Sequence, residues 1–114
     1  MVHATIRMLI PPKRRREVIE ILSSLAERSR FEAGCIGTRV CQDVEVESAI
    51  LIDQLWKSGE DLERYLRSEE YRKMLLVVEM ALEPPEIRFD EISRSSGVET
   101  IEKARNVIVG GGRF

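Results

Sequence analysis

The chain has 114 residues, a length that favours one domain over two. Hydrophobic residues make up 43% and charged residues 33%, which argues against a disordered chain. The formal net charge of −2 argues against a nucleic-acid binder that works through bulk positive charge. No apolar run reaches the roughly 20 residues that span a bilayer, so no membrane contact is expected. The basic cluster at 13–16 follows the first apolar stretch, the reverse of a secretory signal, and the expected location is cytoplasmic.

The cysteines give no sign of a disulfide or a metal. Cys35 and Cys41 fall on one expected strand, where their Cα atoms would be about 20 Å apart, too far for a bridge. Two cysteines and the single histidine, His3, also make a poor structural zinc site, which usually takes four ligands. We interpret His3 as an ordinary surface or interface histidine.

The first part of the chain predicts a strand and a long helix. Residues 1–10 alternate, with one fully apolar face, which is typical of a strand. Pro11 and Pro12 end it and favour a helix start. Apolar residues at helical spacing then predict one amphipathic helix over 13–31, with Gly34 as the left-handed residue after it.

Two further strands are expected over 35–43 and 48–56, joined by the short acidic segment 44–47. On the first of them Arg39 is expected to share a face with Cys35 and Cys41, as a salt-bridge partner or an anion contact. The run Ala-Ile-Leu-Ile at 49–52 is apolar on both faces, so something should cover each side of the sheet. Helices can cover one side, and a partner subunit the other.

Two helix-start signals, at 58–61 and 68–70, predict a broken second helical region with pieces over 60–67 and 69–81. The i, i+3, i+4, i+7 pattern predicts the residues that face the sheet: Tyr71, Met74, Leu75, Val78 and Leu82. Pro84 and Pro85 stop the helix, and 86–92 is the fourth strand, with Ile87 and Phe89 inward.

The composition shifts after residue 93. We expect a domain over 1–93 and an extension over 94–114, made of a short helix and a flexible tail that lies over a partner or frays. The glycines at 110–112 lack the following helix that a phosphate-binding loop needs.

The predicted order is the β-α-β-β-α-β pattern of a ferredoxin-like α+β domain with an antiparallel sheet. Right-handed crossovers place both helices on one face of the sheet. The other face should be bare and apolar, and burying it predicts a homodimer that packs sheet on sheet.

Several motifs occur together in an order that resembles the antibiotic biosynthesis monooxygenase family, and within it the quinol monooxygenase branch. They are Gly34-Cys35 opening the second strand, Trp56 ending the third, and the pattern Ser-x-Glu-Asp-Leu-x-x-x-Leu from Ser58. The segments SEEYRKML, EPPEIRFDEIS and GVETIEKAR continue the likeness, which covers residues 1–105.

The resemblance implies a dimeric α+β barrel and oxidation of a quinol or similar hydroxylated aromatic by molecular oxygen, without a metal or flavin cofactor. It implies a pocket between the sheet and the second helical region, lined by Trp56, Tyr65, Met74 and Val78, with Gln54 and Arg39 as further substrate contacts. Many members carry Glu and His where this chain has Gln54 and Tyr65. Tyr65 is then the remaining catalytic candidate, although its ordinary pKa near 10 makes it a poor base.

Two alternatives stay open. One is a non-catalytic barrel of the same kind that binds a small ligand or serves in stress or regulation. The other is a pure assembly domain. A related branch degrades haem, but here Tyr65 and Leu75 occupy the corresponding helix positions, so an axial ligand is missing.

Overall fold

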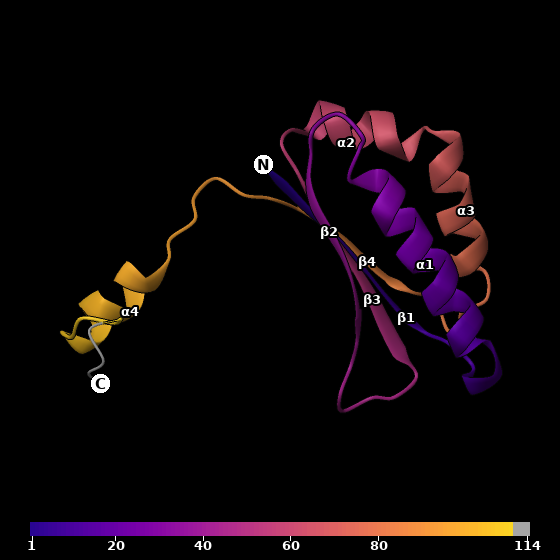
Figure 1. Cartoon of the computed structure of the whole chain (residues 1–114), viewed down its shortest axis with the longest axis horizontal. Coiled ribbons are helices and arrows are strands. Elements are labelled where there is room, and N and C mark those ends of the chain that lie inside the picture. Colours follow the sequence, from indigo (N-terminus) through magenta and orange to yellow (C-terminus); the bar gives the residue numbers. More distant parts are fainter. Residues whose placement is uncertain (111–114) are drawn as a thin grey trace.

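A computed structural model describes residues 1–110 of the chain. In them one four-stranded antiparallel sheet, with strand order β2-β3-β1-β4, is covered on one face by helices (Figure 1). The elements run in the order β1 (Val2–Leu9), η1 (Pro12–Arg14), α1 (Arg15–Ser29), β2 (Cys35–Gln42), β3 (Ala49–Trp56), α2 (Gly59–Leu66), α3 (Glu69–Val78), β4 (Glu86–Glu91) and α4 (Val98–Arg105). This is the ferredoxin-like α+β fold that the sequence predicts.

The helix boundaries differ from the predicted ones by a few residues. Helix α1 begins at Arg15 because the prolines first set a 3₁₀ turn, and it ends at Ser29 rather than at Phe31. Gly34 has the expected left-handed conformation, with φ of +83°. The broken second helical region is confirmed: Ser58 and Ser68 accept hydrogen bonds from the first turns of α2 and α3.

The core lies between the sheet and helices α1 to α3. The apolar face predicted for β1 is buried: Met8 lies with Ile50 and Ile52 of β3 in the core that also contains Val18 and Leu22 of α1. Antiparallel pairing sets Ile6 opposite Ile52, so the two apolar faces coincide. Apolar side chains at every second position of the strands and at helical spacing on α1 therefore pack together in one core.

Helix α3 presents a different stripe from the predicted one. Tyr71 and Met74 are buried as expected, and Val77 completes the stripe. Leu75 is 52% exposed and Leu82 61% exposed, so their predicted inward positions are wrong. The helix ends at Val78, which leaves Leu82 in the following loop, and its rotation turns Leu75 outward.

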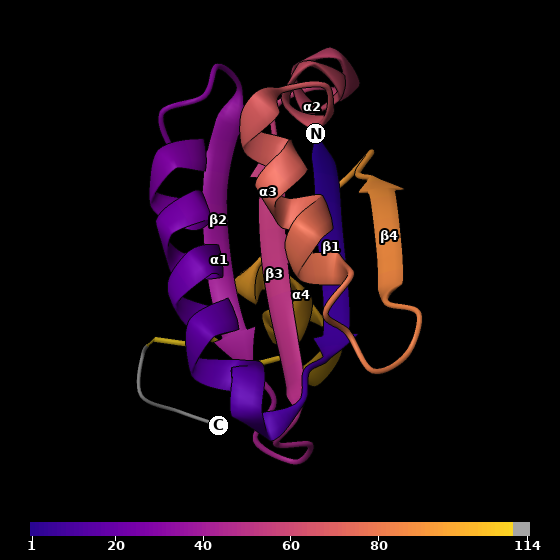
Figure 2. The ribbon, with the colours of Figure 1, turned by 90° about the vertical axis from the view of Figure 1, so that its right-hand side faces the viewer.

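The edge strand β4 is only partly covered. Ile87 and Phe89 pair with Ile6 and Ala4 of β1, which places them on the helix-covered face. They point inward as expected, but they remain 44% and 48% exposed. Figure 2 shows why: α1 and α3 lie over the other strands and do not extend over β4.

A β-bulge at the start of β2 changes which side chains share a face. Cys35 pairs with Trp56, and Gly37 pairs with Leu55, so one extra residue is inserted between the two pairs. Cys35 therefore points to the helix-covered face, whereas Arg39 opposes Asp53 on the other face. The prediction that Arg39 shares a face with Cys35 is wrong for this reason. Both cysteines are free.

The second face of the sheet, here called the open face, is the one opposite α1, α2 and α3 (Figure 1). It is not the apolar surface that the sequence predicts. Leu51 and Leu55 alternate on β3 with Asp53, and β1 adds His3 and Arg7. Its centre is charged, and the leucines beside that centre are half-buried.

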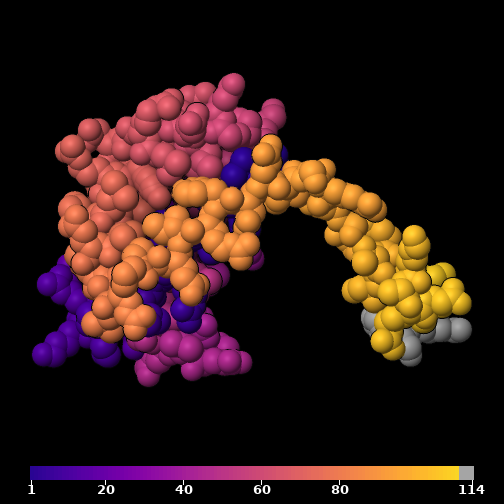
Figure 3. Space-filling view, turned by 180° about the vertical axis from the view of Figure 1, so that it is seen from behind, coloured from indigo at the N-terminus to yellow at the C-terminus, as the bar shows by residue number. Residues whose placement is uncertain are grey.

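Beyond β4 the chain leaves the body. Residues 92–97 contain no helix or strand, and α4 stands away from the sheet on the side of the open face (Figures 1 and 3). The glycine run and tail that the sequence singles out fall largely on residues 111–114, outside the described residues. Among those described, no helix combines the length and apolarity needed to cross a membrane.

Candidate functional site

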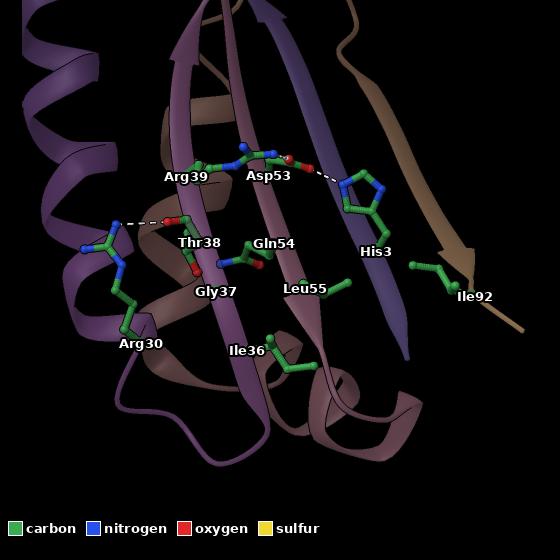
Figure 4. Close-up of a pocket in the computed structure, with 10 residues that line it drawn as sticks. All are labelled: His3, Arg30, Ile36, Gly37, Thr38, Arg39, Asp53, Gln54, Leu55 and Ile92. Carbon is green, nitrogen blue, oxygen red and sulfur yellow. Dashed lines mark hydrogen bonds and ion pairs between the residues drawn. The ribbon is translucent and has the colours of Figure 1, made fainter. Parts of the chain in front are cut away.

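The open face contains a cavity of about 660 Å³. Its apolar walls come from Ile36, Leu55 and Ile92, and its polar wall includes His3 and Asp53 (Figure 4). A volume of this size falls in the range of small-molecule sites, which combine apolar walls with a few placed polar groups. The cavity lies on the face opposite α1 to α3, and the sequence places its expected pocket under those helices.

Asp53 is the centre of the polar wall. It lies on β3 directly opposite Thr5 of β1 and Arg39 of β2, so the three strands bring these side chains together. Its Oδ2 accepts a hydrogen bond from Arg39 Nη2 at 2.8 Å. Its Oδ1 contacts His3 Nε2 and accepts from Thr5 Oγ1 at 3.3 Å. Figure 4 shows the Arg39 and His3 side chains reaching the carboxylate from opposite sides.

The hydrogen bonding fixes the tautomer of His3. An ionised carboxylate only accepts hydrogen bonds, so Nε2 of His3 carries the proton that faces Asp53. In the neutral ring, Nδ1 then keeps its lone pair and can accept a proton. Asp53 thus orients the imidazole.

The charges keep Asp53 ionised. Partial burial alone would raise the pKa of the Asp53 carboxyl, but hydrogen bonds from Arg39 and His3 outweigh it and hold the pKa below its usual value. In turn, the hydrogen bond to Asp53 raises the pKa of Arg39. The cluster therefore carries a carboxylate and a guanidinium across the working pH range of most enzymes.

A second polar group lies on the helix-covered face. Trp56 donates from Nε1 to Oε1 of Gln54 at 3.3 Å, and its ring centroid is 4.8 Å from that of Tyr65. Tyr65 stacks in turn on Tyr71, with centroids 5.5 Å apart. Burial raises the pKa of Tyr65, and the nearby Gln54 amide only partly opposes that rise. As a base at neutral pH, Tyr65 is therefore poorer than free tyrosine.

Two atoms of this group are buried without a hydrogen-bond partner among the described residues: Gln54 Nε2 and Tyr65 Oη. Unpaired buried polar atoms cost free energy, and native proteins hold few of them. Gln54 also lines the open-face cavity. Its side chain, however, points to the helix-covered face, with Trp56.

The predicted substrate contacts divide between two places. Trp56, Tyr65 and Met74 are core residues, each with at most 2% of its surface exposed, and Val78 packs half-buried against that core. Gln54 and Arg39 line the cavity instead. The structure thus brings Trp56, Tyr65 and Gln54 together and leaves Arg39 on the other face of the sheet.

Sequence reasoning missed the pairing of His3 with Asp53. The signal was available, since the open-face positions of residues 1–10 include His3 and those of 48–56 include Asp53. What was lacking was the register, which sets Thr5 against Asp53 and leaves His3 one diagonal step away. Within residues 1–110 no group of three or more His, Cys, Asp or Glu side chains is arranged to hold a metal ion.

Comparison with known proteins identifies the fold and the family. A solved structure of a conserved protein from Methanosarcina mazei Go1 is 23% identical, with a TM-score of 0.74 over 79% of this chain and 90% of that one. A candidate antibiotic biosynthesis monooxygenase from Deinococcus radiodurans is 16% identical, with a TM-score of 0.78 over 85% of this chain and 97% of that one. At such identities the likeness concerns the fold alone. No curated protein matches the chain. The family model for antibiotic biosynthesis monooxygenases matches residues 1–75, and the chain belongs to that family.

Proposed function

We propose that this protein is a monooxygenase that oxidises a quinol or similar hydroxylated aromatic with molecular oxygen, in the open-face cavity. Membership of the family supports the class of reaction. The observation that carries the proposal is the His3–Asp53 pair on the wall of an apolar-sided cavity. A planar aromatic fits between such walls, and its acidic hydroxyl needs the proton acceptor that the pair supplies.

The reaction requires no electron donor beyond the substrate. Nδ1 of His3 takes the phenolic proton, and the electron-rich phenolate passes one electron to O₂. The resulting radical and superoxide combine to form a carbon–oxygen bond, giving a hydroperoxide. Loss of the proton from that carbon then breaks the O–O bond and releases water. A phenol with a free ring position thus yields a quinone, the ring supplying the four electrons that O₂ receives.

The charges of the cluster suit this sequence. Asp53 stabilises the imidazolium that forms when His3 takes the proton, and Arg39 offers a guanidinium to the phenolate. Gln54 is among the residues that line the cavity, but its amide group lies on the helix-covered face, where the carbonyl oxygen accepts a hydrogen bond from Trp56. In this proposal Trp56 and Tyr65 are positioning residues that hold Gln54 from the helix-covered face, and Met74 and Val78 belong to the neighbouring part of the core.

Oxygen consumption by purified protein tests the proposal. We expect uptake above the autoxidation blank with members of a panel of naphthols and quinols, and a quinone product identified by mass spectrometry. His3→Gln and Asp53→Asn should each lower turnover about 100-fold, the usual contribution of a general base. Asp90→Asn is the matched control, because Asp90 lies opposite His3 on β4 but its side chain pairs with Arg88 at 3.2 Å.

Turnover that is unaffected by His3→Gln would remove His3 from the mechanism. Binding without turnover is the second candidate function, and one observation favours it: Tyr65, the predicted catalytic residue, is buried and its pKa is raised by that burial. Calorimetric binding of a naphthol, with no oxygen uptake across the panel, would establish this alternative and refute the monooxygenase.

A further inference from the structure

The side chains that line the open-face cavity carry a net positive charge. With His3 neutral, three of its ten lining residues are formally charged at neutral pH, namely Arg30, Arg39 and Asp53. Arg39 donates to the Asp53 carboxylate at 2.8 Å, so these two charges compensate each other. Within the cavity lining, Arg30 is thus left as a cation without a counter-charge.

Arg30 also lacks an acidic partner elsewhere in the part of the chain that the structure describes. The other arginines of η1 and α1 each pair with a glutamate. The Arg30 guanidinium instead donates from Nη2 to the backbone carbonyl oxygen of Thr38, at 2.9 Å. Glu27, one turn earlier, borders a smaller cavity together with Arg30 but forms no ion pair with it. Because a guanidinium has five N–H donors, most of those of Arg30 remain available to a ligand.

Arg30 and His3 lie at opposite ends of the cavity. The Arg30 side chain reaches the outer edge of β2 at Thr38, whereas His3 belongs to β1 (Figure 4). Strand β3 lies between β2 and β1, so the two ends are separated by two strand spacings, about 10 Å. The floor between them includes Leu55 and Gly37, and a Cβ placed on Gly37 would meet no atom within 4 Å. A flat, extended ring system fits over such a floor.

We propose that Arg30 determines substrate specificity by binding a carboxylate at the end of the substrate far from its reacting hydroxyl. A carboxylate accepts a bidentate pair of hydrogen bonds from a guanidinium, and it supplies the counter-charge that the cavity lacks. The separation of Arg30 from His3 favours two or more aromatic rings between the carboxylate and the hydroxyl. The substrate class is thus a hydroxylated polycyclic aromatic acid. This inference rests on the proposed function, which places the hydroxyl at His3.

Isothermal titration calorimetry with three probes tests this specificity. The probes are 6-hydroxy-2-naphthoate, whose carboxylate is on the far ring, 3-hydroxy-2-naphthoate, whose carboxylate is beside the hydroxyl, and 2-naphthol, which has none. We expect the native chain to bind 6-hydroxy-2-naphthoate about tenfold more tightly than either other probe, as a charge-assisted hydrogen bond allows. An affinity no greater than that of either other probe would overturn the proposal.

A pair of arginine variants assigns the preference to one side chain. Arg30→Gln should weaken binding of 6-hydroxy-2-naphthoate about tenfold and binding of 2-naphthol less than about twofold. Arg28→Gln is the matched control, because Arg28 is also exposed near the end of α1 but pairs with Glu70 at 2.8 Å and does not line the cavity. It should change neither affinity. Equal losses for both probes in Arg30→Gln would indicate a structural role through Thr38 and overturn the proposal.

Gly37→Val tests whether the ligand lies across the floor of the cavity. The added side chain points into open space, and valine suits a strand, so the variant should fold and its thermal unfolding should show this. We expect it to abolish binding of 6-hydroxy-2-naphthoate. Retained binding by the folded variant would place the ligand elsewhere and overturn the proposal.

The same measurements separate this inference from the proposed reaction, because calorimetry does not require turnover. An Arg30-dependent preference for 6-hydroxy-2-naphthoate without oxygen uptake would support the carboxylate site and refute the monooxygenase. Oxygen uptake with 2-naphthol, but no preference for 6-hydroxy-2-naphthoate, would support the reaction and overturn the carboxylate site.

Discussion

Gly34 lies directly against the side chain of Asp61, where the chain that follows α1 passes the first turn of α2. A Cβ built on Gly34 would overlap the Asp61 carboxyl group, and the φ of +83° is one that other residues rarely adopt. The neighbouring backbone is fixed as well, since Lys57 N–H donates to the Gly34 carbonyl at 2.7 Å. The glycine thus allows β2, β3 and α2 to meet.

Gly34→Ala should therefore lower the free energy of unfolding by at least about 2 kcal/mol, through the strained φ and the displaced carboxyl group. Gly59→Ala is the matched control. Gly59 begins α2, and the space that an alanine Cβ would occupy there is open, so this substitution should be neutral or stabilise by up to about 1 kcal/mol. Urea titration at one fixed protein concentration measures both variants. Similar effects from the two would contradict the close contact.

The buried hydroxyl of Tyr65 gives a second prediction. Because this oxygen makes no hydrogen bond of ordinary geometry among the described residues, Tyr65→Phe removes a desolvated polar atom and at most a weak contact with the Gln54 amide. The free energy of unfolding should rise by about 1 kcal/mol. Tyr71→Phe is the control, since Tyr71 is also buried but its hydroxyl is not among the buried unpaired atoms. A loss of stability in Tyr65→Phe would mean that the hydroxyl is hydrogen-bonded in solution.

Oxygen uptake by the same variant separates two roles of Tyr65. If Tyr65 only supports Gln54 through packing, Tyr65→Phe keeps turnover within about threefold, since its ring still stacks on Trp56. A loss of turnover with retained binding of a naphthol would instead make its hydroxyl part of the reaction. The pKa of Tyr65, raised by burial, favours the first outcome.

The type and the order of the secondary-structure elements could be predicted, because they depend on short stretches of sequence. Alternation in β1 and β3, the two serine caps and the proline stops all gave elements of the right type in the right order. The errors concern long-range geometry. The bulge beside Cys35 turns that side chain to the face opposite Arg39. The position of β4 at the edge of the sheet leaves Phe89 half-exposed. Neither feature can be predicted from the residues of one strand alone.

The contrast between local pattern and long-range geometry also explains which parts of the site could be predicted from the sequence. Trp56 and Tyr65 were expected to line one pocket because the family resemblance implies it, and their rings are in contact. His3 and Asp53 are 50 residues apart, and only the register of β1 against β3 brings them together. The strand patterns place both side chains on one face, but predicting the pair also requires the register of β1 against β3.

The reversed orientation of Leu75 on α3 gives a third prediction. Met74 is 1% exposed within the core, whereas Leu75 is 52% exposed. Met74→Ala should cost about 2–4 kcal/mol in unfolding free energy, because it removes buried atoms and leaves a cavity. Leu75→Ala should cost less than about 1 kcal/mol. Urea titration of the two variants distinguishes this packing from the one predicted from sequence, in which both side chains face the sheet.

The charge on Asp53 predicts how stability depends on pH. Because the folded pKa of Asp53 lies below its unfolded value, the folded state binds fewer protons at this site. Its contribution is therefore fully present above the unfolded pKa, near 4, and is lost as the pH falls through the folded pKa. Asp43, Asp61 and Glu70, whose pKa values are also lowered, act in the same direction.

Comparison with Asp53→Asn isolates this one carboxyl group from the others. Between pH 6 and pH 3 the native chain should lose more unfolding free energy than Asp53→Asn does, because the other carboxyl groups contribute equally to both. Asp90→Asn is the control: Asp90 is another acidic residue of the sheet, and its side chain contacts Arg88 rather than His3. Its loss of stability should follow that of the native chain. If the difference between the native chain and Asp53→Asn is the same at both pH values, the hydrogen bonds from His3 and Arg39 do not hold Asp53 ionised in solution.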